Sequence, residues 1–302
     1  MVVGPGAHRA RGALGELVSI PTDGAPLDGL YYEAADPGEP GSGALAGALL
    51  MHGNGQNFYS GPARFLVPHL LGARISCLAF NRRGHDTISC RTRVPEGNAF
   101  QTTAQATADN LAARRFLADR GHSSPVVIGH SNGGLLAASH VVDNPDSRAL
   151  VLLSAHCGGR ALLPRASALG LLARDRLAEI SAKAHQLVAD GKPSELILLP
   201  GWWYATSAAS FVDLEERLPD LLELAAEVRC PALVLRGDED RQLYPAERFA
   251  AIMAAPSTVV VIEGADHFYT GFEDRVGELV ASWLADLLGN DGSLPTKTTS
   301  PE

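Results

Sequence analysis

The sequence has few cysteines, fewer basic than acidic residues, and no long apolar run. The four cysteines, Cys77, Cys90, Cys157 and Cys230, form no CxxC pair and no cluster with histidine, so neither a zinc site nor a dense disulfide framework is expected. We expect them to be reduced and mostly buried. The 25 Lys and Arg against 34 Asp and Glu give a formal net charge of −9, which disfavours nucleic acid and anionic lipid as partners.

Membrane insertion and export are not indicated either. No stretch reaches the roughly eighteen apolar residues of a membrane-spanning helix, and the first 14 residues lack the apolar centre of a signal peptide. We therefore expect a cytoplasmic protein with no membrane partner. With 302 residues, of which 46% are hydrophobic, the chain can bury one large core. One main domain with an insertion is expected rather than two equal domains.

Short apolar runs alternate with longer helical patterns, which predicts an α/β fold with a mostly parallel sheet between layers of helices. The predicted strands are Ala48–Met51, Ile75–Phe80, Val126–Ile128, Ala149–Leu153, Ala232–Leu235 and Val259–Ile262. The predicted helices are Arg64–Leu71, Ala104–Arg120, Leu135–Val142, Ala246–Ala254 and Asp274–Leu288. Before them, Leu17–Ile20 and Leu27–Tyr32 flank Asp23–Gly24 and predict a hairpin at the edge of the sheet.

Two segments depart from this alternation. The chain from about His156 to Val228 is rich in alanine and leucine and shows no convincing strand pattern, so it is expected to be a helical insertion. The last residues, 290–302, are polar with Gly, Ser, Pro and Thr, which predicts a disordered tail.

The strongest chemical motif is Gly129-His130-Ser131-Asn132-Gly133, a GxSxG sequence. It follows a predicted buried strand and precedes a predicted helix, which is the context this motif requires of a serine nucleophile. Small residues on both sides of Ser131 allow the sharp, strained turn that exposes the hydroxyl. The backbone N–H of Asn132 then lies at a helix N-terminus, where it favours an oxyanion. The alternative is a structural turn that happens to contain a serine.

A second small-residue turn, His52-Gly53-Asn54-Gly55-Gln56, ends the first predicted parallel strand. Its backbone donors can face the serine, and the N–H of Asn54 is the expected second donor of an oxyanion hole. His52 itself is interpreted as a structural residue that braces the turn.

Candidates for the acid and the base follow the last two predicted strands. Gly237-Asp238-Glu239-Asp240 places three carboxylates at a strand end, where catalytic groups of open α/β sheets collect. Asp240 is the preferred acid, Asp238 is the alternative, and Glu239 is expected to face water. His267 lies on the loop after the next strand and is the expected general base; a surface histidine that caps a helix is the alternative reading. Asp240 would fix its tautomer.

With these segments in hand, the chain resembles the α/β-hydrolase superfamily, and in particular its serine esterases and lipases, over roughly Leu45 to Leu288. The motifs that carry the resemblance are His52-Gly53-Asn54-Gly55, Asn81-Arg82-Arg83-Gly84-His85, Gly129–Gly133, Gly237–Asp240 and Gly264-Ala265-Asp266-His267. His85 departs from the pattern, because many relatives have glycine there. The order Ser131, Asp240, His267 is the order this fold produces.

The resemblance implies an α/β-hydrolase core domain made of residues 1–155 and 229–289, with residues 156–228 as a helical cap. It implies cofactor-independent and metal-independent hydrolysis of a carboxylic ester of a small or medium hydrophobic substrate, through an acyl-enzyme. Lactonase, thioesterase, C–C bond hydrolase or haloperoxidase activity and a non-catalytic ligand-binding receptor stay open. A small-molecule substrate is the expected partner, and a homodimer also stays open.

Aromatic residues make up only 6% of the chain, yet Trp202, Trp203 and Tyr204 are adjacent within the predicted cap. They are candidates for the wall of a substrate pocket, together with Phe58 after the oxyanion turn and Phe268 beside His267. The alternative for the trio is that it anchors the cap on the core. For the other two, the alternative is ordinary packing.

Overall fold

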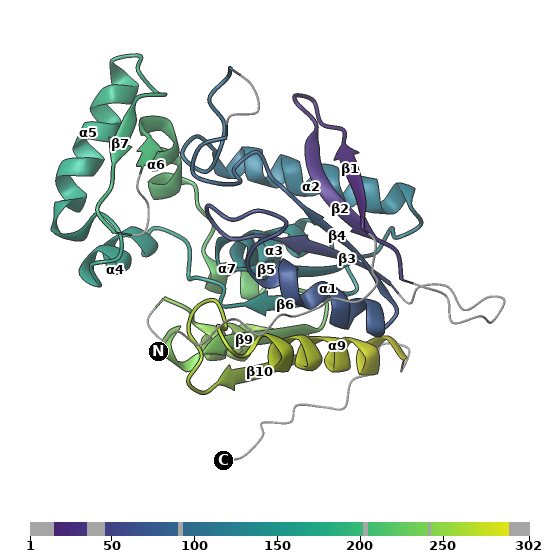
Figure 1. Cartoon of the computed structure of the whole chain (residues 1–302). Coiled ribbons are helices and arrows are strands. Elements are labelled where there is room, and N and C mark those ends of the chain that lie inside the picture. Colours follow the sequence, from purple (N-terminus) through teal and green to yellow (C-terminus); the bar gives the residue numbers. More distant parts are fainter. Residues whose placement is uncertain (1–14, 35–45, 90–92, 202–204, 241–242, 290–302) are drawn as a thin grey trace, which may run out of the picture.

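The computed structural model describes residues 15–34, 46–89, 93–201, 205–240 and 243–289. An eight-stranded sheet lies at the centre of the molecule, between layers of helices (Figure 1). Its strands are β1 (Glu16–Ile20), β2 (Leu27–Tyr32), β3 (Ala46–Met51), β4 (Ile75–Phe80), β5 (Val126–His130), β6 (Ala149–Leu153), β9 (Ala232–Gly237) and β10 (Ser257–Ile262). Two further strands, β7 (Leu196–Leu198) and β8 (Ala205–Ser207), form a separate small sheet.

The strands of the large sheet follow the order β1-β2-β4-β3-β5-β6-β9-β10. The hairpin of β1 and β2 lies at one edge, and β2 is antiparallel to both of its neighbours, β1 and β4, whereas β4, β3, β5, β6, β9 and β10 are parallel to one another. Every residue of the inner strands β3, β4, β5, β6 and β9 is buried, because helices cover both faces of the sheet. This is why these strands are continuous apolar runs in the sequence.

The helices are α1 (Pro62–Gly72), α2 (Thr103–Asp119), α3 (Asn132–Asp143), α4 (Leu162–Ala168), α5 (Leu177–Ala189), α6 (Ala208–Glu216), α7 (Leu221–Ala225), α8 (Ala246–Ile252) and α9 (Glu273–Gly289), with short 3₁₀ turns η1 (Arg174–Arg176) and η2 (Asp238–Asp240). One face of the sheet is covered by α1 and α9, and the other by α2, α3, α7 and α8. Each leucine buried in these layers contributes about 2 kcal/mol to folding. The predicted fold class is confirmed.

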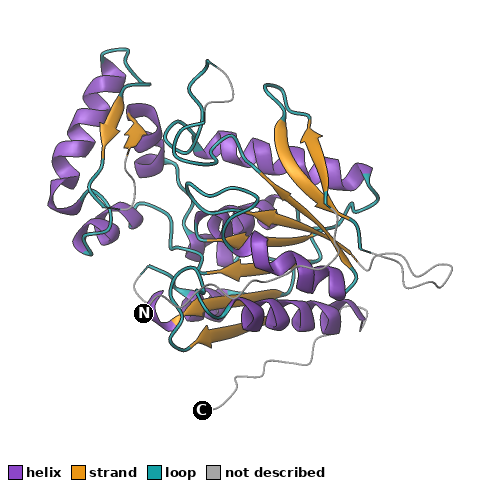
Figure 2. Cartoon of the chain, viewed as in Figure 1, coloured by secondary structure: helices purple, strands orange, loops and turns teal. Residues whose placement is uncertain are grey.

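The chain between β6 and β9, which we call the insertion segment, carries α4, α5, β7, β8 and α6, and these stand to one side of the sheet (Figure 2). The expectation that it contains no strand is wrong, because β7 and β8 pair antiparallel. Three-residue strands are too short to show a period of two in the sequence. In contrast, α7 packs on the core face with α3 and α8. The range 156–228 as a separate cap stays a prediction.

Other expectations concern single features. Cys77, Cys157 and Cys230 are free and buried, whereas Cys90 and the predicted tail 290–302 lie outside the described residues. Within the described ranges, no helix has the length and hydropathy needed to cross a membrane.

Candidate active site

Ser131 lies at the junction of β5 and α3, at the edge where the parallel strands end. Its backbone has φ 56° and ψ −121°, a conformation that L-residues rarely adopt and that costs on the order of 1–3 kcal/mol. The Ser131 N–H donates to the Leu153 carbonyl over 2.9 Å, which ties the turn to the neighbouring strand β6. This hydrogen bond to β6 therefore holds the strained backbone of Ser131 in place. The turn leaves Ser131 between the end of β5 and the first residue of α3.

Two glycines allow this turn to pack against its surroundings. A Cβ at Gly129 would lie 2.2 Å from the Gly133 carbonyl oxygen, and a Cβ at Gly133 would lie 2.3 Å from the Met51 carbonyl oxygen. Both distances are far shorter than carbon and oxygen tolerate, so each position requires glycine. The close approach of α3 to the end of β3 brings the Ser131 turn beside the loop of residues 52–56.

That loop presents backbone donors at the same edge. Gly53 N–H donates to Gln56 Oε1 over 3.0 Å, which folds the loop back on itself. Within the described part of the chain, neither the Asn54 nor the Asn132 N–H donates to a protein acceptor. Asn132 is the first residue of α3, so its N–H also lies at the positive end of the helix dipole. The two N–H groups are available to a negatively charged oxygen.

His52 has both ring nitrogens engaged. Nδ1 lies 2.8 Å from the Gly53 carbonyl oxygen, and Nε2 accepts from the Arg82 N–H over 3.1 Å. Complete burial lowers its pKa well below the ordinary value. The ring therefore connects the loop after β3 to the turn after β4.

Asp240 and His267 come together from the ends of β9 and β10. His267 Nδ1 lies 2.9 Å from Asp240 Oδ2, and Asp240 is 8% exposed. The Tyr244 ring lies 4.9 Å from the His267 ring, centroid to centroid, and supports it from one side. Asp238, the alternative acid, instead accepts from the Gly264 N–H over 2.9 Å, and Glu239 is exposed. Of the three carboxylates, Asp240 faces His267.

Two histidines that the sequence analysis did not select lie beside this pair. His130 Nε2 donates to the His267 carbonyl over 2.9 Å, and burial, with a smaller effect of His267, lowers the pKa of His130 to about 3. His156 accepts from the Gly158 N–H at Nδ1, so its Nε2 donates to Asn132 Oδ1 over 3.2 Å. Burial lowers the pKa of His156 to about 4. Both rings are neutral near pH 7.

The sequence positions of His130 and His156 could have identified both as site residues. His130 is the variable residue of GxSxG, and His156 follows β6 at the edge where site residues collect. Neither belongs to a motif by residue type, which is why the sequence analysis did not select them.

A cavity of about 250 Å³ contains Ser131 and His267 in its wall. The other lining residues are Gly53, Asn54, Gln56, His130, His156, Leu162, Ala166, Leu172 and Phe268. The three aliphatic residues come from the insertion segment, so the site lies between the sheet edge and that segment. The arrangement combines a hydroxyl, an imidazole and two free backbone donors with an apolar wall.

Of the five predicted substrate-binding residues, one lines this cavity, one packs on the core and three lie outside the described residues. Phe268 lines the cavity and is 52% exposed. Phe58 is not among the residues that line it; this ring packs against the core cluster beneath α1 and α9. Trp202, Trp203 and Tyr204 lie outside the described residues. A role in substrate binding stays a prediction for all five.

The model of the family described as "Alpha/beta hydrolase family" matches residues 48–282, well over half of the chain. No curated protein matches the sequence. Similar solved structures include Est1E from Butyrivibrio proteoclasticus with bound ferulic acid, which is 16% identical, with 90% of this chain and 99% of that chain covered and a TM-score of 0.68.

A monoacylglycerol lipase from Paleococcus ferrophilus is 17% identical, with 86% of this chain and 98% of that chain covered and a TM-score of 0.60. The alpha/beta hydrolase GrgF from Penicillium sp. sh18 is 13% identical, with 93% and 100% covered and a TM-score of 0.68. At such identities the structures share the fold alone. The resemblance inferred from the motifs is confirmed by the family model: the chain belongs to the alpha/beta hydrolase family.

Proposed function

We propose that the protein hydrolyses a carboxylic ester of a small or medium hydrophobic substrate, with Ser131 as nucleophile, His267 as general base and Asp240 as the acid that orients it. One observation carries the proposal. Ser131 and His267 line the same cavity, and His267 Nδ1 lies 2.9 Å from Asp240 Oδ2. A hydroxyl and an imidazole in one cavity wall, with a buried carboxylate to orient the imidazole, support a serine-hydrolase mechanism.

The tautomer of His267 sets the direction of proton transfer. With Nδ1–H donating to Asp240, Nε2 is left with its lone pair and can accept the Ser131 proton. Serine then attacks the ester carbonyl, and the N–H groups of Asn54 and Asn132 stabilise the negative oxygen that develops. The proton on Nε2 passes to the leaving alcohol, and an acyl-enzyme forms. A water molecule activated by the same nitrogen releases the acid.

The cavity supports a hydrophobic substrate of limited size. Leu162, Leu172 and Phe268 form an apolar part of its wall, and its volume of about 250 Å³ is just below the usual range for small-molecule sites. His130 and His156 are neutral near pH 7, so neither ring adds a positive charge that would select a carboxylate in the substrate.

The test compares the wild type with Ser131→Ala on p-nitrophenyl esters of increasing acyl length, at equal concentration of folded protein. We expect the variant to lose activity by at least about 10³-fold, and the length profile of the wild type to fall off once the chain exceeds the cavity. A fluorophosphonate should label the wild type and not the variant. Thioesters and lactones in the same assay report the reaction class. A wild type that neither turns over any of these substrates nor becomes labelled would contradict the proposal.

A further inference from the structure

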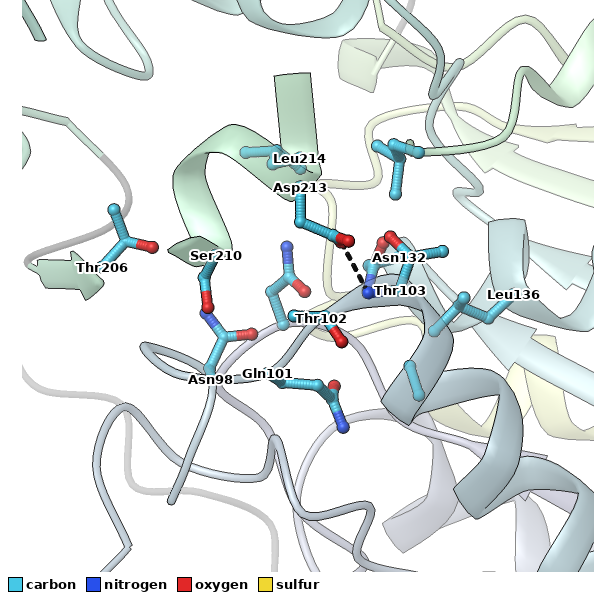
Figure 3. A pocket seen from close by; sticks show the side chains of 13 residues that line it. Asn98, Gln101, Thr102, Thr103, Asn132, Leu136, Thr206, Ser210, Asp213 and Leu214 are labelled. Carbon is cyan, nitrogen blue, oxygen red and sulfur yellow. Dashed lines mark hydrogen bonds between the residues drawn. The ribbon is translucent and has the colours of Figure 1, made fainter. Parts of the chain in front are cut away.

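A second, polar cavity (Figure 3) adjoins the first, because the two share Asn54 in their walls. It has a volume of about 50 Å³, which is room for about three or four water-sized groups. Asn54 lines both cavities, and Asn132 lines the polar one. A substrate whose carbonyl oxygen meets these two N–H groups therefore has one apolar and one polar space within reach.

Besides Asn54 and Asn132, two parts of the fold contribute polar side chains to the wall of this cavity. The loop that precedes α2 contributes Asn98 and Gln101, and α6 of the insertion segment contributes Ser210 and Asp213. Among the described residues that line it there is no lysine, arginine or histidine. The side chains labelled in Figure 3 are mostly amides and hydroxyls, with Asp213 facing Thr103 and Asn132. The cavity therefore carries negative charge and no compensating positive charge.

Asp213 needs hydrogen-bond donors. It is 9% exposed, and its Oδ2 accepts from the Thr103 N–H over 2.6 Å. In the described part of the chain, Oδ1 accepts no hydrogen bond and no cationic group pairs with the carboxylate. Asp213 borders the cavity, so a ligand that fills the cavity displaces water from the carboxylate and must supply a donor in its place. A ligand group with an O–H or N–H can supply that donor.

Two neighbouring side chains, Ser210 and Asn98, offer further hydrogen-bonding groups to a ligand. Ser210 Oγ accepts from Ser207 Oγ over 3.0 Å, so the Ser210 proton is left to donate elsewhere. The Asn98 carboxamide makes no hydrogen bond with a described residue. The cavity thus offers both acceptors and donors, which matches a hydroxyl because that group both donates and accepts. An anionic group would be repelled by Asp213, and an apolar group would leave these polar atoms unpaired.

We propose that the polar cavity is a specificity subsite for a hydroxyl-bearing part of the substrate. The inference rests on the proposed ester hydrolysis and narrows it: the substrate is an ester with one apolar part in the larger cavity and one small, hydroxylated part against Asp213, Ser210 and Asn98. The hydroxyl belongs either to the acid or to the alcohol half of the ester, and the same wall chemistry serves both.

Two pairs of near-isosteric esters test the subsite. On the alcohol side, 2-hydroxyethyl butyrate is compared with propyl butyrate; on the acid side, ethyl 3-hydroxybutyrate is compared with ethyl 3-methylbutyrate. For each pair we measure the ratio of kcat/KM, hydroxylated over plain. We expect a ratio above about ten for one pair, because an unmatched buried polar group costs at least that factor. The pair that responds shows which half of the ester enters the cavity.

Variants connect the ratio to the cavity. Asp213→Asn keeps an oxygen that can accept from Thr103 but removes the charge, and Asn98→Ala removes a carboxamide that bonds no described residue. Each should lower the ratio of the responsive pair by about three- to tenfold. Glu216→Gln is the matched control: it removes a carboxylate from the same helix, but at an exposed position outside the cavity, and should leave the ratio unchanged. If Asp213→Asn fails to fold, Asn98→Ala decides.

The failure of this inference and the failure of the proposed function are distinguishable. The esters could be hydrolysed in a Ser131-dependent way while neither pair shows a higher kcat/KM for the hydroxylated ester, or while the ratio is the same in both variants as in the wild type. Either result would contradict the proposed subsite and leave the proposed ester hydrolysis intact. If no ester is turned over and a fluorophosphonate does not label Ser131, the proposed function fails, and the subsite fails with it.

Discussion

At the scale of single residues, the turn after β9 separates two aspartates that look alike in the sequence. Asp240 lies 2.9 Å from His267 Nδ1, whereas Asp238 accepts from a backbone N–H of the loop after β10. The first can fix the tautomer of the imidazole; the second holds two loops together. Their different contacts allow a matched comparison in which charge and position along the chain are nearly constant.

Replacing Asp240 with Asn should lower kcat for ester hydrolysis by about 10²- to 10⁴-fold with little change in KM, because the amide no longer stabilises the protonated imidazole or its correct tautomer. Asp238→Asn should retain kcat within about tenfold. Steady-state kinetics on a p-nitrophenyl ester measure both. Equal losses in the two variants would mean that Asp240 has no special role.

At the scale of elements, the contact of α3 with the end of β3 positions the proposed nucleophile against the oxyanion loop. No side chain separates the two backbones at Gly133, where an added Cβ would lie 2.3 Å from the Met51 and 2.4 Å from the His52 carbonyl oxygens. Backbone atoms cannot rotate away as a side chain can, so α3 would have to move.

We expect Gly133→Ala to lower the free energy of unfolding by about 2 kcal/mol or more and to abolish activity, because the shift displaces Ser131. Gly72→Ala, at the end of α1, is the control: its Cβ would meet no atom within 4 Å, and the change should be neutral or stabilising by less than about 1 kcal/mol. Thermal unfolding and esterase assays measure the two outcomes. A Gly133→Ala protein with unchanged stability would show that the turn does not need the close approach.

At the scale of the whole molecule, four buried histidines connect stability to pH. They lie in or after three strands and in one helix: His52, His130, His140 and His156. Burial is the main cause that lowers each pKa, to about 3 for His130 and about 4 for His140 and His156, and well below 6.5 for His52. Below pH 6.5 the unfolded chain therefore binds protons that the folded chain does not.

This difference in proton binding means that the free energy of unfolding falls as the pH falls. The stability contributed by these groups is full above pH 6.5 and is lost as the pH falls towards 4, by at most about 1.4 kcal/mol per pH unit for each histidine. Urea unfolding at about pH 7, 6 and 5 should show a decline of at least about 2 kcal/mol in total. His140→Gln, remote from the proposed nucleophile, should make the decline shallower. Stability that is constant or rises over this range would contradict the prediction.

The sequence alone determined the fold class, the positions of the strands in the large sheet and the motif around Ser131. Inner strands are buried on both faces, so their apolar runs are continuous, and all of them were predicted to within three residues at either end. The order Ser131, Asp240, His267 could also be read, because the carboxyl ends of parallel strands meet at one edge. These features depend on local composition and on order along the chain.

Only the tertiary structure decided which groups meet. It distinguished Asp240 from Asp238, brought the neutral His130 and His156 beside His267, and paired β7 with β8. It also formed the polar cavity, whose wall combines Asn98 with Asp213 across more than a hundred residues of chain. No sequence period records such a meeting, because it depends on how the insertion segment packs over the sheet edge, and packing at that distance is a property of the folded molecule.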